Sequence, residues 1–308
     1  MHETSLNTKA DRSKNVKVWL FQGTLIILLI LGIINFGFNV LFLTVVSLVV
    51  SFLIELAFAK LRKKPFDKEW LTTPLLIVLI LPPGVPIWLA GIATFFAVFF
   101  GKNIFGGSGK YIFSPALVGL VFVLISFPVD MATNWISPGG DLFTGVTPLR
   151  SLLAGTNPYP YTFLNLLLGQ APGATGETVR IAVLILGVLL MIFNVRDWKV
   201  STSFLGFFVI LTVLSFVIFK GAFDRNPLLS LFSGGLLFGA FFIASDPVLA
   251  PLTSMGKVVY GFGLALLTFI IRFFGTFPEG VMFAILLMSA VSPLIDNAFP
   301  VKDKVESV

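Results

Sequence analysis

The chain has 308 residues, of which 56% are hydrophobic and 12% charged, and its mean hydropathy is +0.99. A soluble domain has roughly 45–50% apolar and about 25% charged residues, so this composition predicts a polytopic membrane protein. The sequence has no cysteine and a single histidine, His2, which excludes thiolate metal sites, protein-held iron–sulfur clusters and histidine-ligated haem. Any redox chemistry must therefore come from an organic cofactor.

Apolar runs recur along the whole chain, and a membrane helix needs about 20 mostly apolar residues. The runs lie near residues 18–37, 38–59, 71–84, 86–101, 114–128, 180–195, 201–219, 227–244, 258–274 and 280–297. They predict an all-α integral membrane protein with about ten transmembrane helices. The third and fifth runs are short, and Pro82–Pro86 interrupts the chain after the third. Broken helices of this kind line buried sites in transporter-like folds.

Lysine and arginine concentrate in alternate loops, which predicts that both termini are cytoplasmic. The net charge of +6 is thus explained by inward-facing loops and indicates no nucleic-acid partner. The predicted organisation is a tail (1–17), a five-helix half (18–128), an extracytoplasmic loop (129–179), a second five-helix half (180–299) and a tail (300–308). Similar Phe-Gly junctions after Asn103 and after Arg272 would then face opposite sides, which predicts an inverted repeat.

Three polar segments carry candidate site residues. The first, Gly140–Leu149, reads Gly-Asp-Leu-Phe-Thr-Gly-Val-Thr-Pro-Leu; the second spans Gly173–Thr178, at the start of an apolar run; the third places Asp246 before Pro247. Each has an ordinary alternative: a Thr/Gly turn, a glycine-rich loop with a capping threonine, and a turn aspartate. Asn103 and Lys102 interrupt an apolar run and are candidates for lining a midplane cavity. Ionisable residues at membrane depth are costly and usually functional.

These segments resemble, in order, motifs of the family that contains the D subunit of Rnf ferredoxin:NAD⁺ oxidoreductases and the B subunit of Na⁺-pumping NADH:quinone reductases. The resemblance covers about residues 71–299. It rests on Gly106–Ala116, Asp141–Thr147, Gly173–Thr178, Ala244–Pro251 and Pro278–Asp296. The length of this chain is more similar to that of the Rnf D subunit than to that of the quinone-reductase B subunit, whose N-terminal region is longer. Two positions depart from the family pattern: Val146 replaces an alanine, and Ser114 replaces an asparagine.

The resemblance implies a membrane electron carrier with FMN esterified to the Thr147 hydroxyl. Asp141 would be recognised by the flavin transferase, Thr144 and Gly145 would let the backbone turn near the phosphate, and Arg150 would pair with that phosphate. Gly176, Glu177 and Thr178 would contact the cofactor at a helix start, and Asp246 and Asn103 would belong to an ion pathway. A non-covalent riboflavin is a second implied cofactor.

The implied partners are the other subunits of an Rnf-type complex, the flavin transferase and lipid, in the inner membrane of a prokaryotic cell. The chain has no glycine-rich dinucleotide motif, so NAD⁺ would bind elsewhere. Three alternatives stay open because fold does not fix function. They are a quinone-reductase B-like subunit, a urea- or ammonium-type channel, and a scaffold without flavin.

Overall fold

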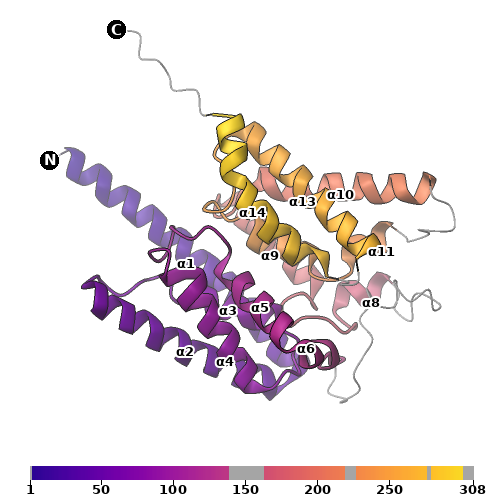
Figure 1. Ribbon diagram of the computed structural model, residues 1–308, viewed down its shortest axis with the longest axis horizontal. Coiled ribbons are helices and arrows are strands. Elements are labelled where there is room, and N and C mark those ends of the chain that lie inside the picture. The colour runs from indigo at the N-terminus through magenta and orange to yellow at the C-terminus, as the bar shows by residue number, and fades with distance from the viewer. Residues whose placement is uncertain (1, 139–162, 219–226, 276–278, 301–308) are drawn as a thin grey trace, which may run out of the picture.

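The computed structural model describes residues 2–138, 163–218, 227–275 and 279–300, with side chains from residue 13 onward. Its regular elements in those residues are helices (Figure 1). They are α1 (His2–Phe36), α2 (Phe38–Arg62), α3 (Thr72–Ile80), α4 (Ile87–Phe96), η1 (Ala97–Asn103), α5 (Pro115–Ser126), α6 (Pro128–Thr133), α8 (Phe163–Leu168), α9 (Arg180–Ile192), α10 (Trp198–Ile218), α11 (Pro227–Phe232), α12 (Leu236–Phe238), η2 (Gly239–Ala244), α13 (Ser254–Phe274) and α14 (Gly280–Ala298).

Among the described residues, five helices are long and apolar enough to cross a membrane, which confirms the membrane-protein prediction. They are Ser13–Phe36 of α1, and α2, α10, α13 and α14. Shorter apolar helices cover Ile87–Asn103, Pro115–Ser126 and Arg180–Ile192. Every apolar run in the sequence thus contains helix, while the count of ten crossings and the inverted repeat stay predictions. Helix α1 also extends back through the polar segment that was predicted as a tail.

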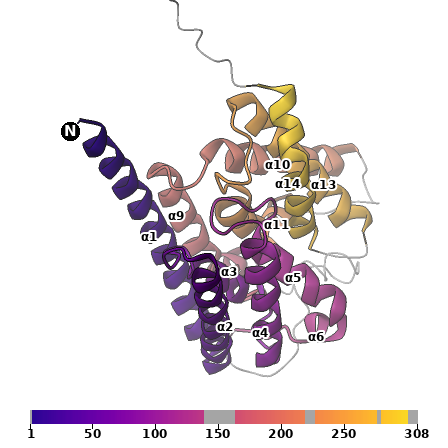
Figure 2. The same ribbon diagram turned by 60° about the vertical axis from the view of Figure 1, so that its left-hand side comes forward.

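The helices form two groups that follow chain order. Figures 1 and 2 show α1 to α6 in indigo to magenta on one side, and α10, α11, α13 and α14 in orange to yellow on the other. Within the first group α2 packs against α3 and α4; within the second, α13 packs against α10 and α14. Helix α9 contacts α1 and so joins the groups. Large apolar side chains such as Ile34 (73% exposed) and Phe38 (75%) cover the outer surfaces, as lipid contact requires.

The end of α3 is closed by the segment that precedes α9. The backbone N–H of Gly176 donates to the carbonyl of Leu79 at 2.7 Å, and that of Thr175 to the carbonyl of Leu81 at 3.4 Å. The Asn39 amide donates to the carbonyl of Pro83 at 2.7 Å. An unsatisfied backbone group in hydrocarbon costs several kcal/mol, so these bonds are what permits the chain to break here.

We expect Gly176→Ala to destabilise the protein by about 1–3 kcal/mol, because any side chain at this position would be too close to neighbouring atoms. A Cβ at Gly176 would lie 2.8 Å from the Cβ of Leu79 and 3.1 Å from its carbonyl oxygen. Gly206 in α10 has no atom within 4 Å of the same position, so Gly206→Ala should be neutral or stabilising by up to about 1 kcal/mol. Thermal unfolding in detergent measures both; equal midpoints for the two variants would contradict this packing.

Candidate functional site

Two carboxylates converge on the start of α12. Glu177 precedes α9, and Glu279 precedes α14. The backbone N–H of Gly235 donates to both carboxylate oxygens of Glu279 at 3.3 Å. A Cβ at Gly235 would lie 3.1 Å from Oε2 of Glu177 and 3.6 Å from Oε2 of Glu279. A side chain at Gly235 would therefore crowd the Glu177 carboxylate.

Two buried arginines complete what we call the glutamate–arginine cluster, which consists of Glu177, Arg180, Arg272 and Glu279. Arg180 and Arg272 are 2% and 1% exposed. Arg180 donates to the carbonyl of Leu166 at 2.8 Å and to that of Phe232. Arg272 donates to the carbonyls of Ser230 (2.9 Å) and Ser233 (3.1 Å). Burial of charged side chains at membrane depth costs free energy, and residues that are buried in this way usually have a function. The cluster is therefore a candidate site.

Burial and the neighbouring Glu279 carboxylate raise the pKa of Glu177, although Arg180 opposes that shift. Glu177 lies in the loop before α9 and is 7% exposed. Desolvation disfavours the ionised form of a carboxyl group, and a nearby like charge adds to that effect. Proton uptake at Glu177 is therefore easier than at an exposed glutamate.

Gly176, Glu177 and Thr178, which were predicted to contact a cofactor, lie in a hydrogen-bonded turn before α9. Glu177 accepts a bond from the backbone N–H of Ala174 at 2.8 Å, and the Thr178 hydroxyl donates to the carbonyl of Ala174 at 2.8 Å. Both side chains therefore close the turn on which they lie. The N-cap of α9 is Val179, with no side-chain bond, so the interpretation of a capping threonine is wrong. Cofactor contact by these residues stays a prediction.

A cavity of about 70 Å³ connects the cluster with the chain that leads to the predicted flavin acceptor. Its lining includes Glu177, Glu279, Met131 and Trp135. Trp135 is four residues before the segment 139–162. The predicted acceptor residues Asp141, Thr144, Gly145, Thr147 and Arg150 lie outside the described residues.

At the opposite ends of the helices, Asp246 joins the two halves of the chain. The Tyr111 hydroxyl donates to Oδ2 of Asp246 at 2.9 Å, and Nη1 of Arg196 lies 3.1 Å from the same oxygen. The Arg196 guanidinium also lies over the Phe21 ring, 3.7 Å from its centre. Burial first, and then the Asp246 carboxylate, raise the pKa of Tyr111 well above its usual value. Asp246 therefore has a structural role, while an ion-pathway role stays a prediction.

We expect Asp246→Asn to destabilise the protein more than Tyr111→Phe. The first leaves Arg196, which is 7% exposed, without its acidic partner, at a cost of about 2–4 kcal/mol after allowing for partial exposure. The second removes one hydrogen bond to a charged group, worth about 1.5–3 kcal/mol at most. Denaturant unfolding in mixed micelles gives the order, and a reversed order would contradict the Arg196–Asp246 pairing.

A second ion network involves Lys102, which the sequence suggested only as a cavity-lining residue. Its ammonium group lies 2.7 Å from Oε1 of Glu55 and 3.0 Å from Oδ2 of Asp67, and Lys102 is 2% exposed. Burial alone would raise the pKa of Asp67, but Lys102 and a hydrogen bond from Ser108 lower it overall. The η1 segment, a π-helix, places Lys102 in this position. Such segments are frequent at functional sites.

Asn103 ends η1 and lies against the end of α2. Its amide donates to the carbonyl of Val98 at 3.1 Å, and its own carbonyl accepts from Arg62. Asn103 lines a cavity at the end of α2 and Lys102 does not, while a midplane cavity lined by the two residues stays a prediction. Tyr111 and Arg196 were not predicted as site residues, and Lys102 was predicted only to line a cavity. Tyr111 lies within Gly106–Ala116, a segment that resembles a family motif, and that resemblance could have identified it. The sequence around Arg196 and Lys102 indicated only cations of inward-facing loops.

Comparison with known proteins extends over almost the whole chain. The sequence model of the NQR2, RnfD, RnfE family matches residues 3–303. Similar curated proteins include the D subunit of the proton-translocating ferredoxin:NAD⁺ oxidoreductase complex of Clostridium ljungdahlii, at 34% identity over 96% of this chain and 92% of that protein. The D subunit of the Na⁺-translocating ferredoxin:NAD⁺ oxidoreductase complex of Acetobacterium woodii is 34% identical over 96% of this chain and 94% of that protein.

A third relative is the D subunit of an ion-translocating oxidoreductase complex of Actinobacillus succinogenes, 35% identical over 92% of this chain and 91% of that protein. The names of the first two relatives specify different ions at the same identity. Similarity to these relatives therefore does not select the coupling ion.

Proposed function

Because the chain belongs to the NQR2, RnfD, RnfE family, we propose that it is an electron-transfer subunit that carries covalent FMN on Thr147 in an Rnf-type ferredoxin:NAD⁺ oxidoreductase complex. The observation that carries the proposal is the similarity to D subunits of such complexes over 92–96% of the chain. Within that region the long loop 129–179 contains Asp141-Leu-Phe-Thr-Gly-Val-Thr147. The inner membrane of a prokaryotic cell, with both termini cytoplasmic, is part of the proposal.

The described residues support a cofactor beside the glutamate–arginine cluster. Trp135, before the segment 139–162, lines the cavity with Glu177 and Glu279. Leu166, after that segment, accepts the hydrogen bond from Arg180. Described residues on both sides of that segment therefore lie next to the cluster. The donor and acceptor groups there are of the kind that the polar edge of a flavin ring binds, and the 70 Å³ cavity is too small to enclose the ring, so these residues would contact its edge only.

Bound FMN supplies one- and two-electron transfer, and the protein's residues hold it and shape its surroundings. In this proposal the Thr147 hydroxyl forms the phosphoester, Asp141 is recognised by the flavin transferase, and Arg150 pairs with the phosphate. Thr144 and Gly145 allow the backbone to turn close to that phosphate. The glutamate–arginine cluster then fixes the charge near the flavin.

Partner subunits must supply what this chain lacks. Without cysteine it cannot hold an iron–sulfur cluster through thiolates, so electrons must reach the flavin from other subunits. Non-covalent riboflavin is a second proposed cofactor, and Asp246 and Asn103 are proposed members of an ion pathway. The matching family also includes the quinone-reductase type, so a B-like subunit is the alternative within the family.

Fluorescence on a denaturing gel tests the proposal, because a covalent flavin survives denaturation. The chain should show a fluorescent band under ultraviolet light when it is produced with its flavin transferase and none when it is produced alone. Intact mass should rise by one FMN less one water. A dark band and an unchanged mass under both conditions would favour a channel or an inert scaffold.

A further inference from the structure

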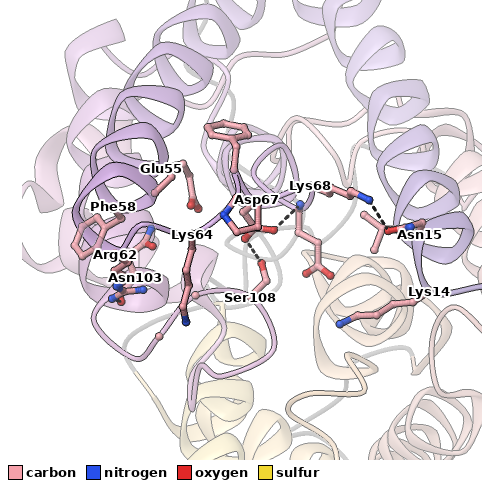
Figure 3. Close-up of a pocket in the computed structure, with 17 residues that line it drawn as sticks. Lys14, Asn15, Glu55, Phe58, Arg62, Lys64, Asp67, Lys68, Asn103 and Ser108 are labelled. Carbon is pink, nitrogen blue, oxygen red and sulfur yellow. Dashed lines mark hydrogen bonds between the residues drawn. The ribbon is translucent and has the colours of Figure 1, made fainter. Parts of the chain in front are cut away.

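A cavity of 590 Å³ opens between α1, the end of α2, the loop 63–71 and the turn after η1 (Figure 3). We call it the basic cavity, because four cations line it: Lys14, Arg62, Lys64 and Lys68. Figure 3 shows these side chains around the cavity, with Asp67 bonded to Ser108 among them. The basic cavity lies at the end of the helices that the distribution of lysine and arginine among the loops predicts to face the cytoplasm.

The carboxylates in the basic cavity do not neutralise its cations. Glu55 and Asp67 both bind the ammonium group of Lys102, which lies behind the cavity wall. The third carboxylate is Glu69, whose pKa is raised by burial and by Asp67. With Lys102 included, five cations face three carboxylates. In the described part of the chain, none of the four lining cations forms a salt bridge.

Apolar side chains also line the cavity. They are Val18 from α1, Phe58 from α2 and Phe66 from the loop, and the Arg62 guanidinium lies 4.8 Å from the centre of the Phe58 ring. Next to the cavity, Leu61 is 78% exposed on α2 and Trp19 is 60% exposed on α1. A ligand that fills this site needs an anionic head and an apolar body, which a soluble phosphate does not have.

We propose that the basic cavity binds an anionic phospholipid. Its phosphate lies among Lys14, Arg62 and Lys64, and its acyl chains follow α1 and α2 into the bilayer. Basic pockets between membrane helices on the cytoplasmic side recognise such headgroups by the same combination of charge and depth. The inference is independent of the flavin on Thr147, because no residue of the cavity belongs to that site.

Native mass spectrometry of the full chain from detergent micelles containing phosphatidylglycerol and phosphatidylcholine tests this inference. The variant Lys14→Gln/Lys64→Gln removes two cavity cations whose side chains make no hydrogen bond within the described structure, so we expect folding to be preserved. We expect phosphatidylglycerol to bind roughly 30-fold more weakly to this variant, from two lost lysine contacts. The matched control is Lys60→Gln/Lys63→Gln, which removes equal charge at the same helix end but outside the cavity lining.

Three results would overturn the inference. Equal losses in the two double variants would indicate binding to general surface charge. Displacement of phosphatidylglycerol by millimolar glycerol phosphate, with no effect of the acyl chains on affinity, would indicate a soluble phosphate ligand. Unchanged lipid binding combined with loss of a neighbouring subunit from the purified complex would indicate a protein-docking site. Selective loss of phosphatidylglycerol in the cavity variant alone supports the lipid site.

Discussion

Thr147→Val is expected to remove covalent flavin completely from a chain produced with its flavin transferase. A phosphoester needs a hydroxyl group, and valine is nearly isosteric with threonine but has none. The fluorescent band on a denaturing gel should disappear, and the intact mass should equal that of the unmodified chain. Because the side chain keeps its volume, expression and detergent stability should be unchanged, so the loss will not reflect misfolding.

Two variants sharpen this test of the attachment site. Thr147→Ser keeps a hydroxyl and should retain flavin. Thr156→Val makes the same chemical change elsewhere in the same polar stretch and should leave the band at full intensity. If Thr147→Val still carries the fluorescent band, the assignment to Thr147 is wrong even though the protein remains a flavoprotein. If Thr156→Val loses the band, the modified hydroxyl has been misassigned within the loop.

Hydrophobic patterning predicted the helices well because the bilayer imposes one constraint on every span. Apolar runs of about 20 residues correspond to α1, α2, α10, α13 and α14. The short helix α3 was also predicted, because Pro82–Pro86 marks its end in the sequence. The extension of α1 to His2 was missed, since a polar helix outside the apolar run has no hydropathy signal.

The polar clusters were only partly predictable, because they join residues that are distant in sequence. Glu177 was predicted as a site residue from its motif, yet its neighbours Arg272 and Glu279 follow it by about a hundred residues, in α13 and directly before α14. Asp246 was identified, but its partner Tyr111 is 135 positions away. A single sequence shows which residues are polar, whereas packing decides which of them meet. The clearest example is Lys102, which reads as an inner-loop cation and is in fact buried.

Lys102→Met should cost about 3–5 kcal/mol of unfolding free energy. The side chain of Lys102 is 2% exposed, and it neutralises Glu55 (5% exposed) and Asp67 (25% exposed). Methionine replaces most of the apolar stem, so lost packing contributes little. The cost comes from leaving two carboxylates without their cation. Lys110→Met, an exposed lysine eight residues later, should change stability by no more than about 0.5 kcal/mol.

A double variant separates charge from packing in this network. Lys102→Met/Glu55→Gln removes the more deeply buried carboxylate together with the cation, so it should recover about 1–3 kcal/mol relative to Lys102→Met alone. Strictly additive costs would show that Lys102 stabilises the fold through packing and not through its charge.

The pH dependence of stability provides a second test of the Lys102 charge. Lys102 and Ser108 hold the pKa of Asp67 below its usual value of 3.8. The stability that Asp67 contributes is therefore present above about pH 4 and is lost as the pH falls through its folded-state pKa. The gap between the native chain and Lys102→Met should accordingly narrow below that pH, as measured by denaturant unfolding in mixed micelles.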